Sequence, residues 1–438
     1  MKKKGVIIWI IIIIIAIGMG IIYNMPINNV NYVKKNSREL KINDINDNKD
    51  LDLILDNIKD KNIVFTNETH GMKENTYIKE KFINYLMDNW NLKYFFVENG
   101  YAECSFINEY LQTGDEKLLN DIFNNFFNIV YTEDEKQVLK KIYLKNKELP
   151  DEKKLKFVGI EAIESYNGVK FYFNNILEKY NNLPKEQIAK IEKILECNEK
   201  EELYTERSNE YIKAIEEFEN DIKENNEAYI KHLNKEEVFN IEFILNNLKN
   251  MSQIGNPEKG GPYVNKEFYE TRDKLSYENI ISIYDHFGEG KTYIHYGIAH
   301  AYQSQFNGVK FLAKNLNDDL KFNGKIYSIN TVYEEGERFN NFSYETERYN
   351  SITTELQNTL KDAGIENSNR IIPLDNKKSP YKKKMYKELF ELQYAYGDEE
   401  MFKNDKGVTT DFFQAEIVIK NPRPIEWNDE EFFKELRK

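Results

Sequence analysis

Six short apolar runs recur along the chain, and longer stretches with helical periodicity separate them. The runs are rich in β-branched and aromatic residues, as buried strands are, and they cover residues 62–66, 94–99, 155–160, 292–297, 325–333 and 415–420. Between the first two, Ile78, Phe82, Leu86 and Trp90 recur every four residues, which indicates a helix that packs one side on a sheet. Strand, helix and strand at this spacing favour parallel pairing. We therefore predict an α/β fold with a mostly parallel central sheet flanked by helices.

The interval 166–253 departs from this rhythm. Its pattern is helical almost throughout and dense in Glu, Lys and Asn, so we expect about residues 166–253 to form a helical lobe inserted between strands of the sheet. Gly and Pro cluster at 254–263, which indicates a loop after the lobe. The predicted domain runs from residue 51 to residue 438.

The N-terminus predicts a membrane anchor. Met1 and three lysines precede nineteen residues without a charge, GVIIWIIIIIIAIGMGIIY, which is about the length that crosses a bilayer core. A cleavable signal peptide has a shorter apolar region and a small-residue cleavage site. We expect residues 1–24 to form an uncleaved single-pass helix and residues 25–50 a polar tether. The lysines should stay on the cytoplasmic side, which places the domain outside the cell.

The composition limits the classes of partner. Lys and Arg total 61 against 74 for Asp and Glu, a formal net charge of −13, which argues against nucleic acid as a partner. The two cysteines, Cys104 and Cys197, are too few and too far apart for a metal-binding knuckle. A disulfide between them and two buried free thiols both remain open, and the sequence does not indicate an oligomeric state.

Ionisable side chains follow four of the predicted strands. His70, Glu98, Glu161 and His300 each stand at or shortly after the end of an apolar run. The carboxyl ends of parallel strands lie along one edge of a sheet, where open α/β sheets bind their ligands. We therefore predict that these four strand-end residues meet in one site although they are far apart in sequence.

These residue types suit hydrolysis by activated water. A histidine can take a proton from water at neutral pH when a carboxylate orients its other ring nitrogen, and Glu98 or Glu161 could do so. Arg272, on a predicted core-facing helix, could stabilise the charge that develops on a carbonyl oxygen, and a second histidine could donate a hydrogen bond to that oxygen.

The candidates also have simpler interpretations. His70 could be a polar residue at a helix start, and Arg272 could form a salt bridge with Asp273 or with a neighbour across its helix. Glu98 and Glu161 are harder to explain in this way, because a carboxylate that closes an apolar strand is costly unless it is paired or faces a polar cleft.

The other three histidines are not placed in the site. His295 lies inside the run TYIHYG and is predicted to be an ordinary strand residue. His232 and His286 stand in charged or loop-like surroundings and are predicted to lie at the surface.

Five pieces of the chain, taken in order, resemble the erythromycin esterase-like proteins. They are THGMKE, FFVENGYAECSFINEYLQTGDE, FVGIE, FYETRDKLSYENI and YGIAHAYQ, and they span most of residues 60–305. The resemblance implies an α/β core with a helical lobe and a metal-independent hydrolase without a cofactor. It also implies that His70 is the general base and that Glu98, Arg272, His300 and Glu74 belong to the site.

The chain departs from the pattern of that family. The family reads Gly-Glu-x-Thr-His-Gly where this chain has TNETHG, so Asn67 takes the place of the glutamate, and an amide cannot supply the charge that raises the basicity of a histidine. Glu68, one residue later, can substitute only if the turn is remodelled. Glu161 stands where the family has an Asp, and the His-Asn-x-His run of some members is reduced to Gly-Ile-Ala-His around His300.

The leading hypothesis is a membrane-anchored hydrolase that cleaves an ester, lactone or amide of a small molecule outside the cell. Macrolide resistance is not expected, because drugs that act on ribosomes are most usefully destroyed in the cytoplasm. One alternative is a haem- or ligand-binding surface protein, since NETH echoes the GExH run of ChaN-like proteins. Another is a metal-dependent hydrolase in which the four strand-end residues hold a divalent ion. A third is a non-catalytic partner-binding domain, for which Asn67 is the main support.

Overall fold

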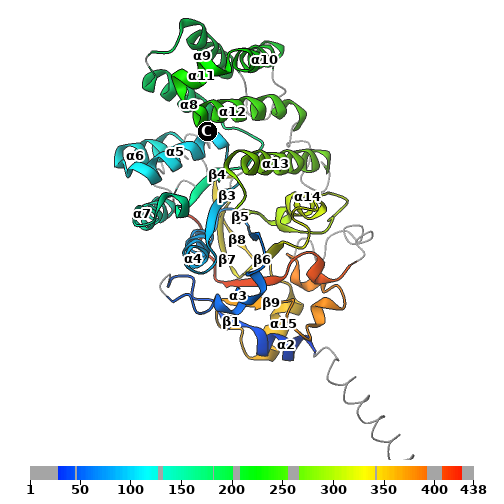
Figure 1. Ribbon diagram of the computed structural model, residues 1–438. Coiled ribbons are helices and arrows are strands. Elements are labelled where there is room, and N and C mark those ends of the chain that lie inside the picture. The colour runs from blue at the N-terminus through cyan, green and yellow to red at the C-terminus, as the bar shows by residue number, and fades with distance from the viewer. Residues whose placement is uncertain are drawn as a thin grey trace, which may run out of the picture.

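The computed structural model describes residues 28–44, 47–126, 132–180, 182–200, 208–254, 266–340, 343–391 and 407–426. Its centre is an eight-stranded sheet in the order β1-β9-β10-β6-β2-β5-β3-β4 (Figure 1). The strands are β1 (Arg38–Glu39), β2 (Ile63–Glu68), β3 (Leu92–Val97), β4 (Lys156–Gly159), β5 (Lys291–Gly297), β6 (Ile326–Glu334), β9 (Arg370–Pro373) and β10 (Ala415–Lys420). A separate antiparallel hairpin consists of β7 (Gly336–Asn340) and β8 (Glu345–Tyr349).

All six predicted runs are strands of the main sheet, and the mixed α/β fold predicted from them is confirmed. The six strands pair in parallel, while β9 and β1 add antiparallel pairing at one side. Every residue of β2 is buried, as is expected of a parallel strand that is covered on both faces.

The helix predicted between the first two strands is α4 (Lys73–Asn89), and Ile78, Phe82 and Leu86 are among its buried residues. Phe82 stacks on Tyr293 of β5 with 5.7 Å between ring centroids, and Tyr293 stacks in turn on Phe95 of β3 at 5.0 Å. The helix and the sheet therefore share one aromatic core. Other helices are α3 (Asp52–Ile58), α5 (Tyr101–Thr113), α6 (Glu116–Asn125), α7 (Glu133–Lys147), α13 (Lys266–Phe287), α14 (Leu312–Asp318) and α15 (Thr354–Ala363).

Five further helices of the described chain follow one another between β4 and α13, and we call them the helical lobe. They are α8 (Tyr166–Lys179), α9 (Lys185–Asn198), α10 (Asn209–Glu224), α11 (Asn226–Leu233) and α12 (Lys235–Ile254). They lie at the β4 end of the molecule (Figure 1). Buried side chains of the lobe such as Tyr211, Phe218 and Ile244 belong to the same hydrophobic core as the sheet.

The segment predicted to be a tether, residues 25–50, is partly folded onto the domain. Asn28 caps α2 (Asn29–Asn36), and β1 pairs with β9. Tyr32 is fully buried, and its hydroxyl donates to the Pro373 carbonyl at 2.8 Å. Packed structure is therefore present from Asn28 onward and not only from Leu51, because apolar side chains of this segment such as Tyr32 and Val33 are buried against the domain.

A buried cation holds the second half of this segment. The Lys81 ammonium of α4 is fully buried and donates to the carbonyl oxygens of Lys41, Asp44 and Asp47 at 3.1, 3.0 and 2.8 Å. It also pairs with Asp50 at 3.0 Å. A buried ammonium needs such partners, so the polar residues of the segment stabilise the domain that they pack on.

The predicted anchor, residues 1–24, lies outside the described residues. Among the helices that the structure describes, none is long and apolar enough to cross a membrane.

The two cysteines do not form a disulfide. Cys104 and Cys197 are both free and buried, so the alternative of two free thiols is the one that the structure shows.

Candidate active site

Ionisable side chains meet at the carboxyl ends of four neighbouring strands, β2, β5, β3 and β4. β2 ends at Glu68, and Glu98 directly follows β3. Glu161 comes two residues after β4, and His300 lies three residues after β5 in the 3-10 turn η3 (Ile298–Ala301). The edge predicted from the sequence therefore carries these residues.

His70 lies between two carboxylates. Its Nδ1 is 2.8 Å from Glu68 Oε1, and its Nε2 is 3.7 Å from Glu98 Oε2. The side chain of His70 is 38% exposed, whereas that of Glu68 is 9% exposed, so solvent reaches the ring but hardly reaches the carboxylate behind it. A carboxylate beside Nδ1 requires the proton on that nitrogen, which leaves Nε2 for the site.

Glu68 also holds a second histidine. Its Oε2 is 2.6 Å from His295 Nε2, and His295 Nδ1 is 2.7 Å from the Thr66 hydroxyl. His295 is a residue of β5, as predicted, and it also supports the site through its contact with Glu68. The register pairs Thr66 with His295 and Glu68 with Gly297, so this ring shares a face of the sheet with the Glu68 carboxylate and fixes its position.

A buried ion cluster joins β3, β4 and α13. The Arg272 guanidinium donates from Nη2 to Glu98 Oε1 at 2.5 Å and from Nε to both oxygens of Glu161 at 3.0 Å. Its Nη2 also contacts Glu161, and the Tyr296 hydroxyl donates to the same carboxylate at 2.7 Å. The salt bridge considered for Arg272 therefore runs to two strand-end glutamates and not to Asp273.

Asp273 instead binds His300. Its oxygens lie 2.6 and 2.8 Å from His300 Nδ1, and Oδ2 accepts the Leu312 N–H at 3.0 Å. Asp273 is completely buried, and burial raises the pKa of its carboxyl above the usual range. His300 thus has the same arrangement as His70, with a carboxylate at Nδ1 and the other nitrogen free to face a ligand.

The two histidines meet at Gly297. A Cβ built on this glycine would lie 3.3 Å from Glu98 Oε2, 3.4 Å from His300 Cδ2 and 3.5 Å from His70 Nε2. The Gly297 N–H donates to Glu98 Oε2 at 2.8 Å. Both imidazoles and one carboxylate therefore surround a single point, which the absence of a side chain at Gly297 keeps open.

Gly297→Ala is expected to lower hydrolytic activity by at least about tenfold without unfolding the protein, since displacements well under 1 Å at reacting groups are costly. The backbone at Gly297 (φ −58°, ψ 160°) suits any residue, so the methyl group is tolerated locally. It would nevertheless crowd Glu98 Oε2 at 3.3 Å and fill the space between His70 and His300, where a reacting group would have to lie. Rate constants and thermal unfolding of the variant check this, and unchanged rates would show that no substrate reacts at this point.

The carboxylates set the proton affinity of His70. Burial by itself would lower the pKa of His70, but the hydrogen bond to Glu68 and the charges of Glu98 and Glu68 outweigh it and raise the pKa to about 9. Burial would likewise raise the pKa of Glu98, yet the charges of Arg272 and His70 lower it to about 2. The raised pKa therefore favours the protonated ring of His70 at neutral pH.

Asn67 does not contact His70. Its Nδ2 donates to Asn330 Oδ1 at 2.7 Å and to the Ile298 carbonyl at 3.1 Å, and its Oδ1 accepts the Thr331 N–H at 2.7 Å. Asn67 therefore ties β2 to β6 and to the turn before His300. The negative charge beside His70 comes from Glu68, so an amide at position 67 does not leave the histidine without a carboxylate.

Glu74 lies outside the cluster. It stands in the first turn of α4, where its Oε1 accepts from Arg423 Nε at 2.9 Å and its Oε2 accepts the Arg423 N–H at 2.8 Å. The structure brings the other five predicted site residues together and places Glu74 at the C-terminal segment, because the turn through Gly71 (φ +86°) separates it from the end of β2.

The two remaining histidines are half-buried in helices. His286 belongs to α13 and stacks on Phe239 of the lobe with 3.7 Å between ring centroids, so it does not lie in a loop. His232 lies near the end of α11.

The described residues were also compared with the requirements of a metal site. In this part of the chain no three His, Cys, Asp or Glu side chains are grouped so that they could hold a metal ion. His70 and His300 each have their Nδ1 beside a carboxylate. A hydrogen bond between an imidazole nitrogen and a carboxylate is a common feature of acid–base sites.

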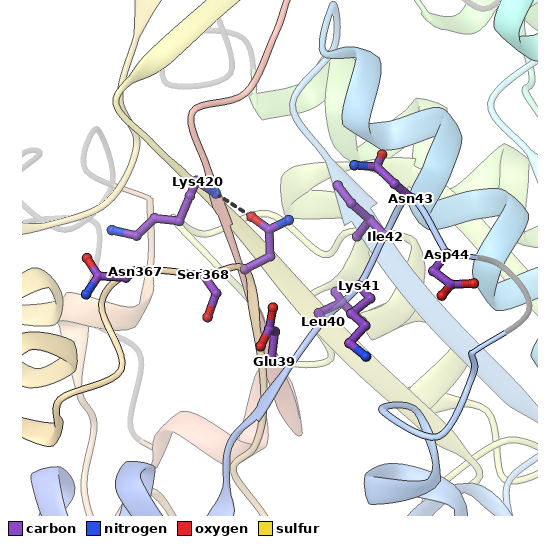
Figure 2. Close-up of a pocket in the computed structure, with 10 residues that line it drawn as sticks. Glu39, Leu40, Lys41, Ile42, Asn43, Asp44, Asn367, Ser368 and Lys420 are labelled. Carbon is purple, nitrogen blue, oxygen red and sulfur yellow. Dashed lines mark hydrogen bonds between the residues drawn. The ribbon is translucent and has the colours of Figure 1, made fainter.

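An open pocket of about 500 Å³ lies elsewhere, between β1 and the start of β9 (Figure 2). Glu39, Lys41 and Asp44 stand on one side of it, and Lys420 on the other, where its backbone N–H donates to Asn369 at 2.8 Å. The pocket contains none of the predicted site residues. It belongs to the β1 side of the sheet, whereas the cluster around Gly297 belongs to the β4 side.

Solved structures share this fold. A Bacillus cereus protein has a TM-score of 0.63 at 16% identity and covers 92% of this chain and 100% of its own. A succinoglycan biosynthesis protein has a TM-score of 0.63 at 15% identity, with 91% and 98% covered. A mutant of erythromycin esterase EreC in its open conformation has a TM-score of 0.61 at 12% identity, with 90% and 99% covered. The fold implied by the resemblance to erythromycin esterase-like proteins is thus confirmed.

Neither a family model nor a curated protein matches the sequence.

Proposed function

We propose that this protein is an erythromycin esterase-like hydrolase that cleaves an ester, lactone or amide bond of a small molecule with water activated by His70. The observation that carries the proposal is the arrangement around Gly297, where His70 Nε2, the His300 ring and the Glu98 carboxylate face one point. Two carboxylate-bound imidazoles at one open position are suited to moving protons to and from a reacting water.

In the proposed reaction the free base of His70 accepts a proton from water at Nε2 while the water oxygen bonds to the carbonyl carbon. Glu68 holds the ring and stabilises the imidazolium that forms. The His70 imidazolium then returns this proton to the leaving oxygen or nitrogen as its bond to carbon breaks, while the His300 ring, held by Asp273, lines the other side of the site. Arg272 keeps Glu98 and Glu161 in place, so the site stays ordered around the substrate.

A panel of nitrophenyl esters, lactones and anilides, incubated with the full chain in detergent, tests this proposal. We expect turnover of at least one ester that persists after dialysis against a chelator, because in the proposed reaction His70 and not a metal ion activates the water. Folded protein that hydrolyses none of the panel would contradict the proposed function. Turnover that disappears with the chelator and returns with a divalent ion would favour the metal-dependent alternative.

The pH dependence of hydrolysis is expected to follow His70. Because its pKa is raised to about 9, the free base is the minor form at lower pH, and kcat/KM should rise about tenfold per pH unit below that value and level off above it. A pH–rate profile from pH 6 to 10 checks this. A profile that is flat between pH 7 and 9 would contradict the assignment of His70 as the base.

Haem binding at His70 meets the same obstacle as general-base catalysis, a proton on the ring. An iron ligand must offer a nitrogen lone pair, and the raised pKa of His70, about 9, keeps the ring protonated at neutral pH. Titration with haem is therefore expected to give no tight change in absorbance. A tight change that His70→Ala abolishes would favour a binding protein.

We also propose that the domain is displayed outside the cell on an N-terminal anchor. Three lysines followed by nineteen uncharged residues support this location and orientation. Alkaline carbonate washing should leave the full chain in the membrane fraction, and protease added to intact cells should degrade the domain. Release of the chain by carbonate, or protection from the protease, would contradict the location.

A further inference from the structure

Lysines gather where the N-terminal segment packs on the domain. Two lie on α2 and six follow β9, and we call these eight the basic face: Lys34, Lys35, Lys377, Lys378, Lys382, Lys383, Lys384 and Lys387. All are exposed except Lys378, which is partly buried. Residues 1–38 and 376–387 contain no Asp or Glu, although the net charge of the chain is −13. The basic face is therefore a local reversal of the charge of the protein.

Contacts between the two segments hold the lysines together. The rings of Tyr32 and Tyr381 meet edge to face with 5.6 Å between centroids, and Tyr381 immediately precedes Lys382. Asn376, which immediately precedes Lys377, donates to Asn36 Oδ1 of α2 at 3.3 Å. Both tyrosines are buried. The lysines thus project from packed elements and form a surface that exists before any partner arrives.

Among the described residues, the acidic groups beside this surface include the exposed Asp411 of η7 (Thr409–Asp411), a turn in contact with η4 (Pro380–Lys382). Asp375 and Glu388 flank the lysine-rich stretch, and each is only partly exposed. Asp375 accepts from Asn57 Nδ2 at 2.7 Å, and Lys382 donates to the Asp375 carbonyl at 3.1 Å. The helix beside α2, α15, carries Glu355, Lys361 and Asp362, so the excess of positive charge belongs to α2 and the stretch after β9.

The chain enters the domain beside the basic face. The apolar N-terminal run ends at Tyr23, and the capping residue of α2 is Asn28, so only residues 24–27 lie between them. Four residues reach at most about 14 Å when fully extended. A helix joined to a membrane span by so short a connection stays close to the lipid headgroups.

We propose that the basic face binds the anionic headgroups of the bilayer that holds the N-terminal run. The proposal rests on the anchor proposed above. Lysines held near an anionic surface each strengthen the attraction, which falls off within a Debye length. Binding would orient the domain with the helical lobe, at the opposite end of the molecule (Figure 1), away from the bilayer. The cluster around Gly297, on the β4 side of the sheet, would then face soluble substrates.

Hydrogen exchange of the full chain in lipid nanodiscs tests the proposal. In nanodiscs that contain phosphatidylglycerol, the amides of residues 381–390 should exchange at least about fivefold more slowly than in pure phosphatidylcholine. High salt should remove the difference, because it screens the charges. Equal exchange in the two lipids would overturn the proposal, and so would equal slowing by a soluble polyanion with phosphatidylcholine alone, which would identify an acidic polymer as the partner.

Charge-reversal variants test whether the effect of anionic lipid depends on the lysines of the basic face or on any exposed lysines. The triple variant Lys382→Glu, Lys383→Glu and Lys384→Glu should lose the effect of phosphatidylglycerol. A control variant reverses three exposed lysines of the lobe, Lys213, Lys223 and Lys231, and should keep the effect with the same change in net charge. If carbonate extracts the chain from membranes, the proposed N-terminal anchor is contradicted. If the chain stays in the membrane but its hydrogen exchange is the same in charged and neutral lipid, only the proposal that the basic face binds headgroups is contradicted.

Discussion

Replacing His70 with glutamine is expected to lower kcat/KM for the proposed ester hydrolysis by about 10³-fold and to leave the protein folded, because a general base contributes about 10²–10⁴-fold to the rate. Glu68 keeps its contact with His295 Nε2 at 2.6 Å when the ring of His70 is removed, so the buried acceptor keeps a partner. The loss therefore reports chemistry and not unfolding. Rate constants on a nitrophenyl ester, with circular dichroism of the same samples, measure it.

The matched control for this variant is His232→Gln in the helical lobe. That histidine is half-buried near the end of α11, and its replacement should change kcat/KM by less than about twofold, because it takes part in no proton transfer. His300→Gln should cause a loss comparable to that of His70→Gln. If His70→Gln keeps more than about a tenth of the activity, a base at this position is not required.

Arg272→Met is expected to lower the free energy of unfolding by about 3–5 kcal/mol, the usual effect of breaking a buried ion pair. The Arg272 side chain is only 12% exposed and bridges Glu98 and Glu161, which are 17% and 7% exposed. Methionine fills much of the space of the arginine stem but leaves two carboxylates without their counter-charge. Urea unfolding of the full chain in detergent, followed by circular dichroism, measures the change.

Arg338→Met provides the comparison for that measurement. Arg338 of β7 pairs with Glu347 of β8, and these side chains are 28% and 38% exposed, so its loss should cost less than about 1 kcal/mol. Adding Glu161→Gln to Arg272→Met should recover part of the stability, since a neutral amide needs no counter-charge. A loss below about 1 kcal/mol for Arg272→Met would mean that water and not the guanidinium stabilises both carboxylates.

Local pattern was sufficient to predict the strands and the edge that carries the site. A parallel strand covered on both faces must be apolar along its length, so runs such as 62–66 and 292–297 can be recognised without knowledge of their partners. An ionisable residue that closes such a run cannot remain in a dry interior without a partner. Glu98, Glu161 and His300 could therefore be assigned to one edge of the sheet from the sequence.

The partners of these groups could not be predicted in the same way. Arg272 and Asp273 are neighbours in sequence but point about 100° apart on their helix, and one binds strand-end glutamates while the other binds His300. His295 joins the site because the register sets it opposite Thr66. A shift of one residue would turn its ring to the other face of the sheet.

The sequence alone established the strands, the helices between them and the residue types at the strand ends, because each depends on a periodicity carried by the segment itself. The tertiary structure decided that the carboxylate beside His70 is Glu68, and that Asn67 does not contact this histidine. It also decided that Glu74 binds Arg423 and that the polar residues after Asn28 fold onto the domain. Strand register and helix packing determine these contacts, because the partners of each side chain come from segments that are distant in sequence.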